Sequence, residues 1–410
     1  MRKYLKNVYV LLASWIIFSF TYSIVDPYIQ LYFTELGGSP TLIGIVFSLT
    51  PLTASVFYIM GSYIADNYGR RWLVTRISFL IAIVCLGYAL SPSWHFLLLF
   101  LILEGVAGVY RPALWALYAD SLPQHRLASG FLLANVMPRL AAIPSPYIGG
   151  RLADLYHIMG YRYGFLMAAI VAFTIAAVRI RYLKETHKVE AKKWSDIPWR
   201  RVFKESWREI AYTLRELPKQ LMVIFVSAII FNMSSYMYAT YRVIVAVKFM
   251  GYTKSVIGSI LSCALMVLAI WTLVIVKYRI LDRVPKVKAM VAIMFIYSIL
   301  YLIYTYGELW SILTAFVLSA VFGTTWASLY NSYLMETTPL ELRARIQALR
   351  MIVRAIATVL GGALASFLYF LYPNYPLIIF YASSVLGFSS ISLVLAYWYR
   401  KKYKIHPLPQ

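Results

Sequence analysis

Apolar segments long enough to cross a bilayer recur along almost the whole chain. A membrane-spanning helix needs about 20 mostly apolar residues, and the sequence offers twelve such segments. They cover residues 8–33, 41–65, 72–90, 94–119, 126–150, 162–183, 219–249, 253–276, 289–306, 309–335, 345–371 and 375–398. With 61% hydrophobic residues and a mean hydropathy of +0.70, the chain is too apolar for a typical soluble domain. The sequence therefore predicts an all-α membrane protein with twelve transmembrane helices.

Positive charge is concentrated at the ends of these segments. The 39 Lys and Arg residues outnumber the 16 Asp and Glu, which gives a net charge of +23. Basic residues favour the cytoplasmic side of a membrane. An N-terminus in the cytoplasm leaves only Arg151, Arg162, Lys248 and Lys254 in the outer loops. This predicts a multi-pass protein of the cytoplasmic membrane with both termini in the cytoplasm, and the charge pattern does not favour nucleic acid as a partner.

One long hydrophilic segment divides the chain. Residues 1–183 and 219–410 hold six predicted spans each, and residues 184–218 form the linker between them. Apolar residues at helical spacing predict an amphipathic helix on the inner leaflet within this linker. These residues are Trp199, Phe203, Trp207, Ile210 and Leu214. Two six-helix bundles related by pseudo-symmetry are a common transporter architecture.

Several short motifs fall between the predicted spans. One follows the pattern Gly-x-x-x-Asp-basic-x-Gly-basic-basic, which is matched at Asp66, Gly69, Arg70 and Arg71. Ser62 replaces the first Gly of the pattern, and Asn67 replaces its first basic residue. Span 5 ends in SPYIGG, which holds Pro146, Gly149 and Gly150, and GYRYGF precedes span 6. In this order on a 6+6 topology, the motifs resemble those of the major facilitator superfamily. An Arg that the family often has in span 4 is absent, because Leu101 occupies its place.

The resemblance implies two helical bundles around a central cavity that opens alternately to each side, usually in a monomer. It also implies that charged residues lock the cytoplasmic helix ends together in one conformation. The residues concerned are Asp66, Gly69, Arg70, Arg71 and Asp120 in the first half, and Asp282, Arg283 and Glu336 in the second. The alternative is that they are ordinary interfacial charges that follow the positive-inside bias.

Polar residues at helical spacing mark four of the spans. Span 1 holds Ser19, Tyr22, Ser23, Asp26 and Gln30; span 4 holds Glu104 and Arg111; span 7 holds Asn232, Ser235 and Arg242; span 10 holds Thr324, Ser328 and Asn331. Charged groups within a bilayer are costly and call for a function or a partner. In the family that the chain resembles, these four helices line the central cavity.

The two acids and the deep arginines favour different roles. Asp26 and Glu104 are candidates for binding a coupling proton, and the alternative for each is a static pair with an Arg. Arg111, Arg139, Arg242 and Arg354 are the deep cations, and their excess over the acids favours an anionic solute. Two other interpretations stay open: Arg354 pairs with Glu336, and Arg139 only joins helices. Arg179, near a span end, is expected to reach the membrane surface.

The sequence favours a secondary active transporter over an enzyme. It shows no nucleotide-binding loop and no nucleophile–His arrangement, and Cys85 and Cys263 lie in apolar runs. We expect a proton-coupled exporter of a drug or metabolite, with the solute, protons and the lipid bilayer as partners and with no cofactor or metal. The alternative is a proton symporter that imports an organic anion or a sugar. A membrane receptor or enzyme is a remote third possibility.

Overall fold

The computed structural model describes residues 5–123, 126–186, 200, 203–204, 208, 219–338 and 343–403, and within these it contains no strand. The first half comprises α1 (Leu5–Tyr22), η1 (Asp26–Tyr28), α2 (Ile29–Glu35), η2 (Pro40–Leu42), α3 (Ile43–Tyr68), α4 (Arg70–Leu90), α5 (Trp94–Ala107), η3 (Gly108–Tyr110), α6 (Arg111–Ser121), α7 (Leu127–Ala141), α8 (Ser145–Tyr156) and α9 (Ile158–Tyr182). The second comprises α11 (Lys219–Lys248), α12 (Lys254–Tyr278), α13 (Ile280–Arg283), α14 (Lys286–Tyr304), α15 (Leu309–Glu336), α16 (Arg343–Leu371) and α17 (Ile378–Tyr403).

The predicted all-helical membrane fold is confirmed. Eleven segments of the described chain are long and apolar enough to cross a membrane. The predicted span at 126–150 is not among them, because it is divided into α7 and α8, of 15 and 12 residues. The amphipathic helix predicted in the linker lies almost wholly outside the described residues.

Three of the membrane segments in the first half are broken. The first is interrupted between Tyr22 and Asp26, the fourth by η3, and the fifth between Ala141 and Ser145. A proline follows closely after each break, and because it has no backbone N–H it begins a new helix more easily than it continues an old one. These prolines are Pro27, Pro112 and Pro146. Pro138, Pro144 and Pro146 predict a kink in span 5 from the sequence, whereas spans 1 and 4 were expected to be continuous helices.

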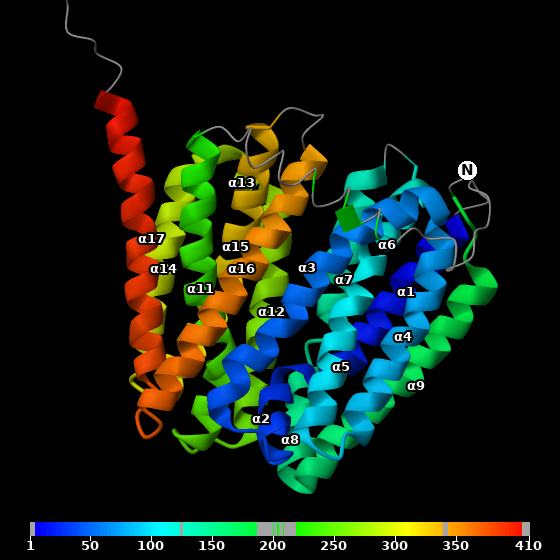
Figure 1. The fold of residues 1–410 in the computed structure, drawn as a ribbon, viewed down its shortest axis with the longest axis horizontal. Helices are drawn as coiled ribbons and strands as arrows, with labels where there is room; N and C mark the ends of the chain where they lie inside the picture. The colour runs from blue at the N-terminus through cyan, green and yellow to red at the C-terminus, as the bar shows by residue number, and fades with distance from the viewer. Residues whose placement is uncertain are drawn as a thin grey trace, which may run out of the picture.

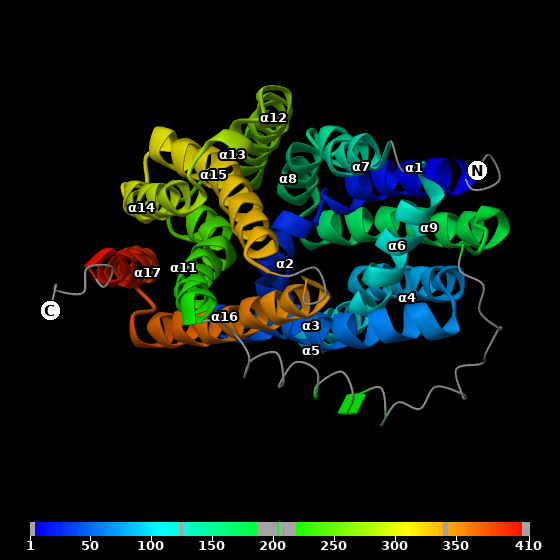
Figure 2. The same cartoon turned by 90° about the horizontal axis from the view of Figure 1, so that it is seen from above.

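The two halves pack tightly at one end of the molecule. Figure 1 shows them converging at α2 and α8 and diverging toward the end that carries the N-terminus, and Figure 2 shows the same two halves from above. The largest contacts between them join α3 to α16 and α8 to α12. A Cβ on Gly44 would collide with the backbone of Gly362, and one on Gly150 with the carbonyl oxygen of Lys254. Glycine therefore lets the backbones of the two halves touch.

Polar contacts reinforce this packed end. The Nζ of Lys254 lies 2.8 Å from the Glu35 carboxylate. The Asp154 carboxylate accepts the backbone N–H groups of Lys254 and Ser255 at 3.1 and 2.8 Å, which caps the start of α12 with a negative charge. All of these bonds join one half to the other, so they hold the packed end closed.

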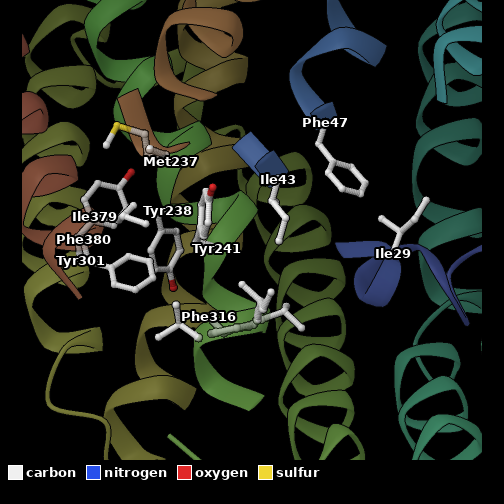
Figure 3. Close-up of a cluster of buried hydrophobic side chains, with 14 of the residues drawn as sticks. Ile29, Ile43, Phe47, Met237, Tyr238, Tyr241, Tyr301, Phe316, Ile379 and Phe380 are labelled. Carbon is white, nitrogen blue, oxygen red and sulfur yellow. The ribbon is translucent and has the colours of Figure 1, made fainter. Parts of the chain in front are cut away.

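Apolar side chains complete the same interface. Figure 3 shows Ile43 of the first half beside Tyr241 of the second, and Tyr238 and Phe316 of the second half belong to the same apolar cluster. The Tyr241 hydroxyl accepts the backbone N–H of Gly44 at 3.1 Å and donates to the carbonyl of Pro40 at 3.2 Å. One aromatic residue thus fixes the start of α3 against α11.

Replacing Gly362 with Leu should separate the halves at this end. The added side chain has no room against Gly44, and overpacking of this kind costs about 1–3 kcal/mol. We expect spin labels at Ser39 and Asn374, in a background without native cysteines, to shift toward longer distances by double electron–electron resonance. Ala363→Leu is the matched control, because Ala363 is the next residue and is exposed. Unchanged distances in Gly362→Leu would show that the glycine contact does not hold this end closed.

Candidate functional site

A cavity of about 360 Å³ lies between the two halves, next to the packed end. Residues from both halves line it. From the first half come Tyr22, Asp26, Pro27, Ile29, Gln30, Phe47, Thr50, Leu101 and Glu104; from the second come Tyr236, Ala239, Thr240, Arg242, Val243 and Leu261. The cavity therefore brings together five residues that the sequence singled out on spans 1, 4 and 7, namely Tyr22, Asp26, Gln30, Glu104 and Arg242.

The two carboxylates of the cavity lie on the same wall. Asp26 begins the short turn η1 after the break in the first segment, and its side chain is exposed toward the cavity. Glu104 lies in the last turn of α5 and accepts the hydroxyls of Tyr22 at 3.0 Å and Tyr88 at 2.7 Å. The two carboxyl groups are close enough to interact electrostatically. Neither forms an ion pair with an arginine in the described part of the chain, so the static acid–Arg pairs considered from the sequence are not observed.

Arg242 supplies positive charge from the opposite half. Its guanidinium lies 4.4 Å from the ring centre of Phe316 and 5.4 Å from that of Tyr238. It donates one hydrogen bond, to the Ser319 hydroxyl at 3.3 Å. Aromatic faces rather than a carboxylate hold this cation, and its full charge remains available to the cavity.

A second, smaller cavity adjoins the first inside the first half. Its volume is about 160 Å³, and Tyr22 and Glu104 line both cavities. Its remaining lining includes Arg111, Cys85 and several apolar residues. Glu104 thus lies between the central cavity and Arg111.

The other predicted cavity residues lie apart from this wall. Asn232 donates to the carbonyl of Ala228 on its own helix at 2.6 Å, and Asn331 accepts a hydrogen bond from Gln347 at 2.5 Å. Arg139 is partly buried in the last turn of α7 and does not line either cavity. The expectation that Arg179 reaches the membrane surface was wrong. Its side chain is buried and donates to Ser78 at 2.8 Å.

The predicted gating residues pair within each half at the end remote from the packed interface. Arg70 forms an ion pair with Asp120, and Lys286 forms one with Glu336. Glu336 thus has Lys286 as its partner, and the interpretation that Arg354 pairs with Glu336 was wrong. The two pairs occupy equivalent places in the two halves, at the start of α4 and α14 and at the end of α6 and α15.

The remaining gating candidates take different positions. Gly69 has a φ of +101°, a conformation that suits glycine. The backbone N–H groups of Arg70 and Arg71 donate to Glu185, which caps the start of α4. Asp282 and Arg283 are exposed on the short helix α13, and the side chain of Asp66 lies outside the described residues. Sequence reasoning missed Glu185 and Lys286, because helix packing and not local spacing decides which charged groups meet.

Two helical halves around a central cavity are an architecture typical of membrane transporters. The family model "Major Facilitator Superfamily" matches residues 11–362, and the chain belongs to this superfamily. The multi-drug resistance efflux pump PmrA of Streptococcus pneumoniae is 28% identical over 185 residues, which cover 44% of this chain and 45% of that protein. The multidrug resistance protein MdtG of Enterobacter lignolyticus is 31% identical over 222 residues, or 52% of this chain and 49% of MdtG.

The chain therefore spans about half the length of the curated relatives it matches. Solved structures match over almost the entire chain. A mutant of the peptide transporter POT in complex with sulfate has a TM-score of 0.77 at 15% identity and covers 96% of this chain and 94% of its own. A mutant of the nucleoside transporter NupG has a TM-score of 0.73 at 16% identity, with 95% and 99% covered. At these identities the likeness establishes the fold alone.

Removing the Tyr88 hydroxyl should destabilise the protein through Glu104. Tyr88→Phe deletes one donor to a carboxylate in the membrane, which costs about 1–2 kcal/mol. In a Glu104→Met background the hydroxyl has already lost its acceptor, so the same substitution should be neutral or stabilising. The measurement is equilibrium unfolding in mixed micelles, with the exposed Tyr372→Phe as control. Equal losses in both backgrounds would mean that the hydroxyl acts independently of Glu104.

Proposed function

We propose that the protein is a proton-coupled exporter of a drug or metabolite that works by alternating access. The observation that carries this proposal is the pair of carboxylates, Asp26 and Glu104, on one wall of the central cavity, where neither forms an ion pair with any residue that the structure describes. Two carboxylates in one confined site repel each other, and a single bound proton removes that repulsion. A solute that enters the cavity changes their surroundings, so binding of the solute and of the proton become linked.

The direction of transport is proposed from the relatives. PmrA and MdtG are named as multidrug efflux or resistance proteins, and the SPYIGG segment lies where the halves meet, with Gly150 against Lys254. The cavity has aromatic walls, and the Tyr236 hydroxyl on its lining is buried without a hydrogen-bond partner among the described residues. Such a lining suits a solute with both apolar and polar groups. An importer of an organic anion or sugar is the alternative, and the sign of accumulation in vesicles distinguishes the two.

Orientation and assembly are part of the same proposal. We take both termini as cytoplasmic, residues 1–183 and 219–410 as the two moving bundles, residues 184–218 as the cytoplasmic linker, and the monomer in the cytoplasmic membrane as the working unit. The packed end at Gly44 and Gly362 then faces outward, and the structure is the inward-open state. In this state the pairs Arg70–Asp120 and Lys286–Glu336 lie within the separated halves.

A membrane-impermeant maleimide tests the orientation. In intact cells of a cysteine-free background it should label a cysteine at the exposed Ser39 and should not label one at the exposed Arg283. Both should react after the cells are permeabilised. Labelling in the opposite order would invert the topology and with it the assignment of an inward-open state.

Asp26→Asn should abolish proton-driven accumulation while leaving exchange intact. The amide keeps the shape of the carboxyl but binds no coupling proton. Inside-out vesicles, energised by a proton gradient, are offered ethidium, chloramphenicol and dansylate as cationic, neutral and anionic probes, and internal pH is followed with pyranine. Whichever probe accumulates is then tested in the variant for gradient-driven uptake and for exchange without a gradient.

The control is Glu308→Gln, because Glu308 is an exposed acid just before α15 and does not line the cavity. It should accumulate the probe as the native chain does. Full accumulation by both Asp26→Asn and Glu104→Gln would exclude these carboxyls as the coupling groups. Accumulation that survives collapse of the proton gradient would exclude proton coupling itself.

A further inference from the structure

Three arginines from both halves gather at the interface between them. Arg111 begins α6 in the first half, and Arg350 and Arg354 lie one turn apart on α16 in the second. Helix α3 lies between the two elements, because it packs along α16 at Gly44 and Gly362 and against η3, which immediately precedes Arg111. This packing places Arg354 within electrostatic range of both Arg350 and Arg111. The hydroxyl of Tyr58 on α3 lies within range of Arg350 and Arg111. These three residues, the arginine cluster, converge on one place although they are about 240 positions apart in the sequence.

No carboxylate neutralises this cluster within the described residues. The ion pairs described there involve Arg70, Lys254 and Lys286 instead. Arg350 donates to Gln347 at 2.9 Å, a neutral partner, and the side chains of Arg111 and Arg354 are exposed. Like charges held together in a membrane protein are unfavourable without a counter-charge. A bound anion would supply the counter-charge that the described residues lack.

The shape of the cluster selects the kind of anion. A guanidinium presents parallel N–H donors that match a carboxylate, sulfonate or phosphate. Arg111 also lines the smaller cavity, where Phe18, Ile81 and Val84 provide apolar walls. A ligand with an anionic head and an apolar body satisfies both surfaces.

We propose that the arginine cluster binds the anionic head of an amphipathic organic solute, a carboxylate or sulfonate on an apolar ring. The site is distinct from the wall that holds Asp26, because Arg350 and Arg354 do not line the central cavity. The solute then bridges the halves, with Arg111 on one side and Arg354 on the other. The proposal names the class of solute for the proposed transporter. Only the bridging of the halves during closure rests on the proposed transport cycle.

The position of the cluster also links binding to closure. The halves are packed at Gly44 and Gly362, so closing the opposite end brings Arg111 toward Arg354. Without an anion that movement increases the repulsion between like charges. A bound anion reverses the sign of the interaction, and the loaded carrier closes more readily than the empty one.

The test compares two dyes that differ in charge, dansylate and dansylamide, on the purified full-length chain in neutral detergent. Fluorescence titration should give dansylate an affinity about tenfold or more above that of dansylamide, which corresponds to about 1.4 kcal/mol. The preference should fall as salt is added. Arg111→Gln and Arg354→Gln should each remove it, and Arg354→Lys should restore part of it because the charge returns.

Arg76→Gln is the matched control, because Arg76 lies 5.0 Å over the Trp72 ring on α4 and is outside the cluster. It should keep the preference for dansylate. Each variant is first checked by thermal unfolding, and the Lys variants serve for any Gln variant that does not fold. Equal affinity for the two dyes, or an unchanged preference in folded Arg111→Gln and Arg354→Gln, would overturn the proposal.

A lipid headgroup has the same chemistry, and a competition arm separates the two sources. Benzenesulfonate should displace dansylate at lower concentration than short-chain phosphatidylglycerol does, and the reverse order would overturn the solute assignment in favour of a lipid. These titrations use no proton gradient. A failure of the vesicle assay to show coupling through Asp26 would therefore not affect the conclusion on anion binding. Equal binding of the two dyes would likewise not affect the conclusion on proton coupling.

Discussion

The close contact of the two halves at one end is the constraint on which the rest of the structure depends. Glycines at Gly44 and Gly362 remove the side chains that would keep α3 and α16 apart, and dispersion forces act fully only at such short range. In a bilayer the hydrophobic effect does not drive helices together, so this packing and the polar contacts of Lys254 must hold the halves. Because these contacts are concentrated at one end, the other end is free to separate, and a cavity forms between.

The cavity is asymmetric, and the broken helices explain why. The first half carries three interrupted segments, whereas the membrane helices of the second half, such as α11, α15 and α16, are continuous. A break leaves backbone groups without helical partners, which is tolerated in a membrane only where protein or water satisfies them. Asp26 stands at one such break, and Glu104 precedes another. Both acids thus lie in the half whose membrane segments are interrupted. Arg242, Arg350 and Arg354 lie on continuous helices of the other half.

Much of this arrangement could be predicted from the sequence. The long apolar runs indicated the helices, and the spacing of polar residues placed Asp26, Glu104 and Arg242 on helix faces that do meet at one cavity. Partners across helices were beyond reach, because a hydrogen bond from Tyr88 to Glu104 leaves no trace in local spacing. The partner of Glu336 was also beyond reach, because the packing of α14 against α15 decides which base it meets. Arg350 was overlooked although it lies one turn from Arg354, a spacing that places both on one face.

The distribution of charge gives the cavity two different chemical neighbourhoods. One wall carries Asp26 and Glu104, and Glu104 is held by two tyrosine hydroxyls, which can stay hydrogen-bonded whether or not a proton is present. The other side carries guanidinium groups that keep their charge at any accessible pH. A proton can therefore change the charge of the first neighbourhood but not of the second, while an anionic solute neutralises only the second. Because Glu104 and Arg111 border the same small cavity, each charge change alters the field at the other group. The coupling that we propose between proton and solute then needs no direct contact between them. It needs only that both affect whether the separated ends of the two halves come together.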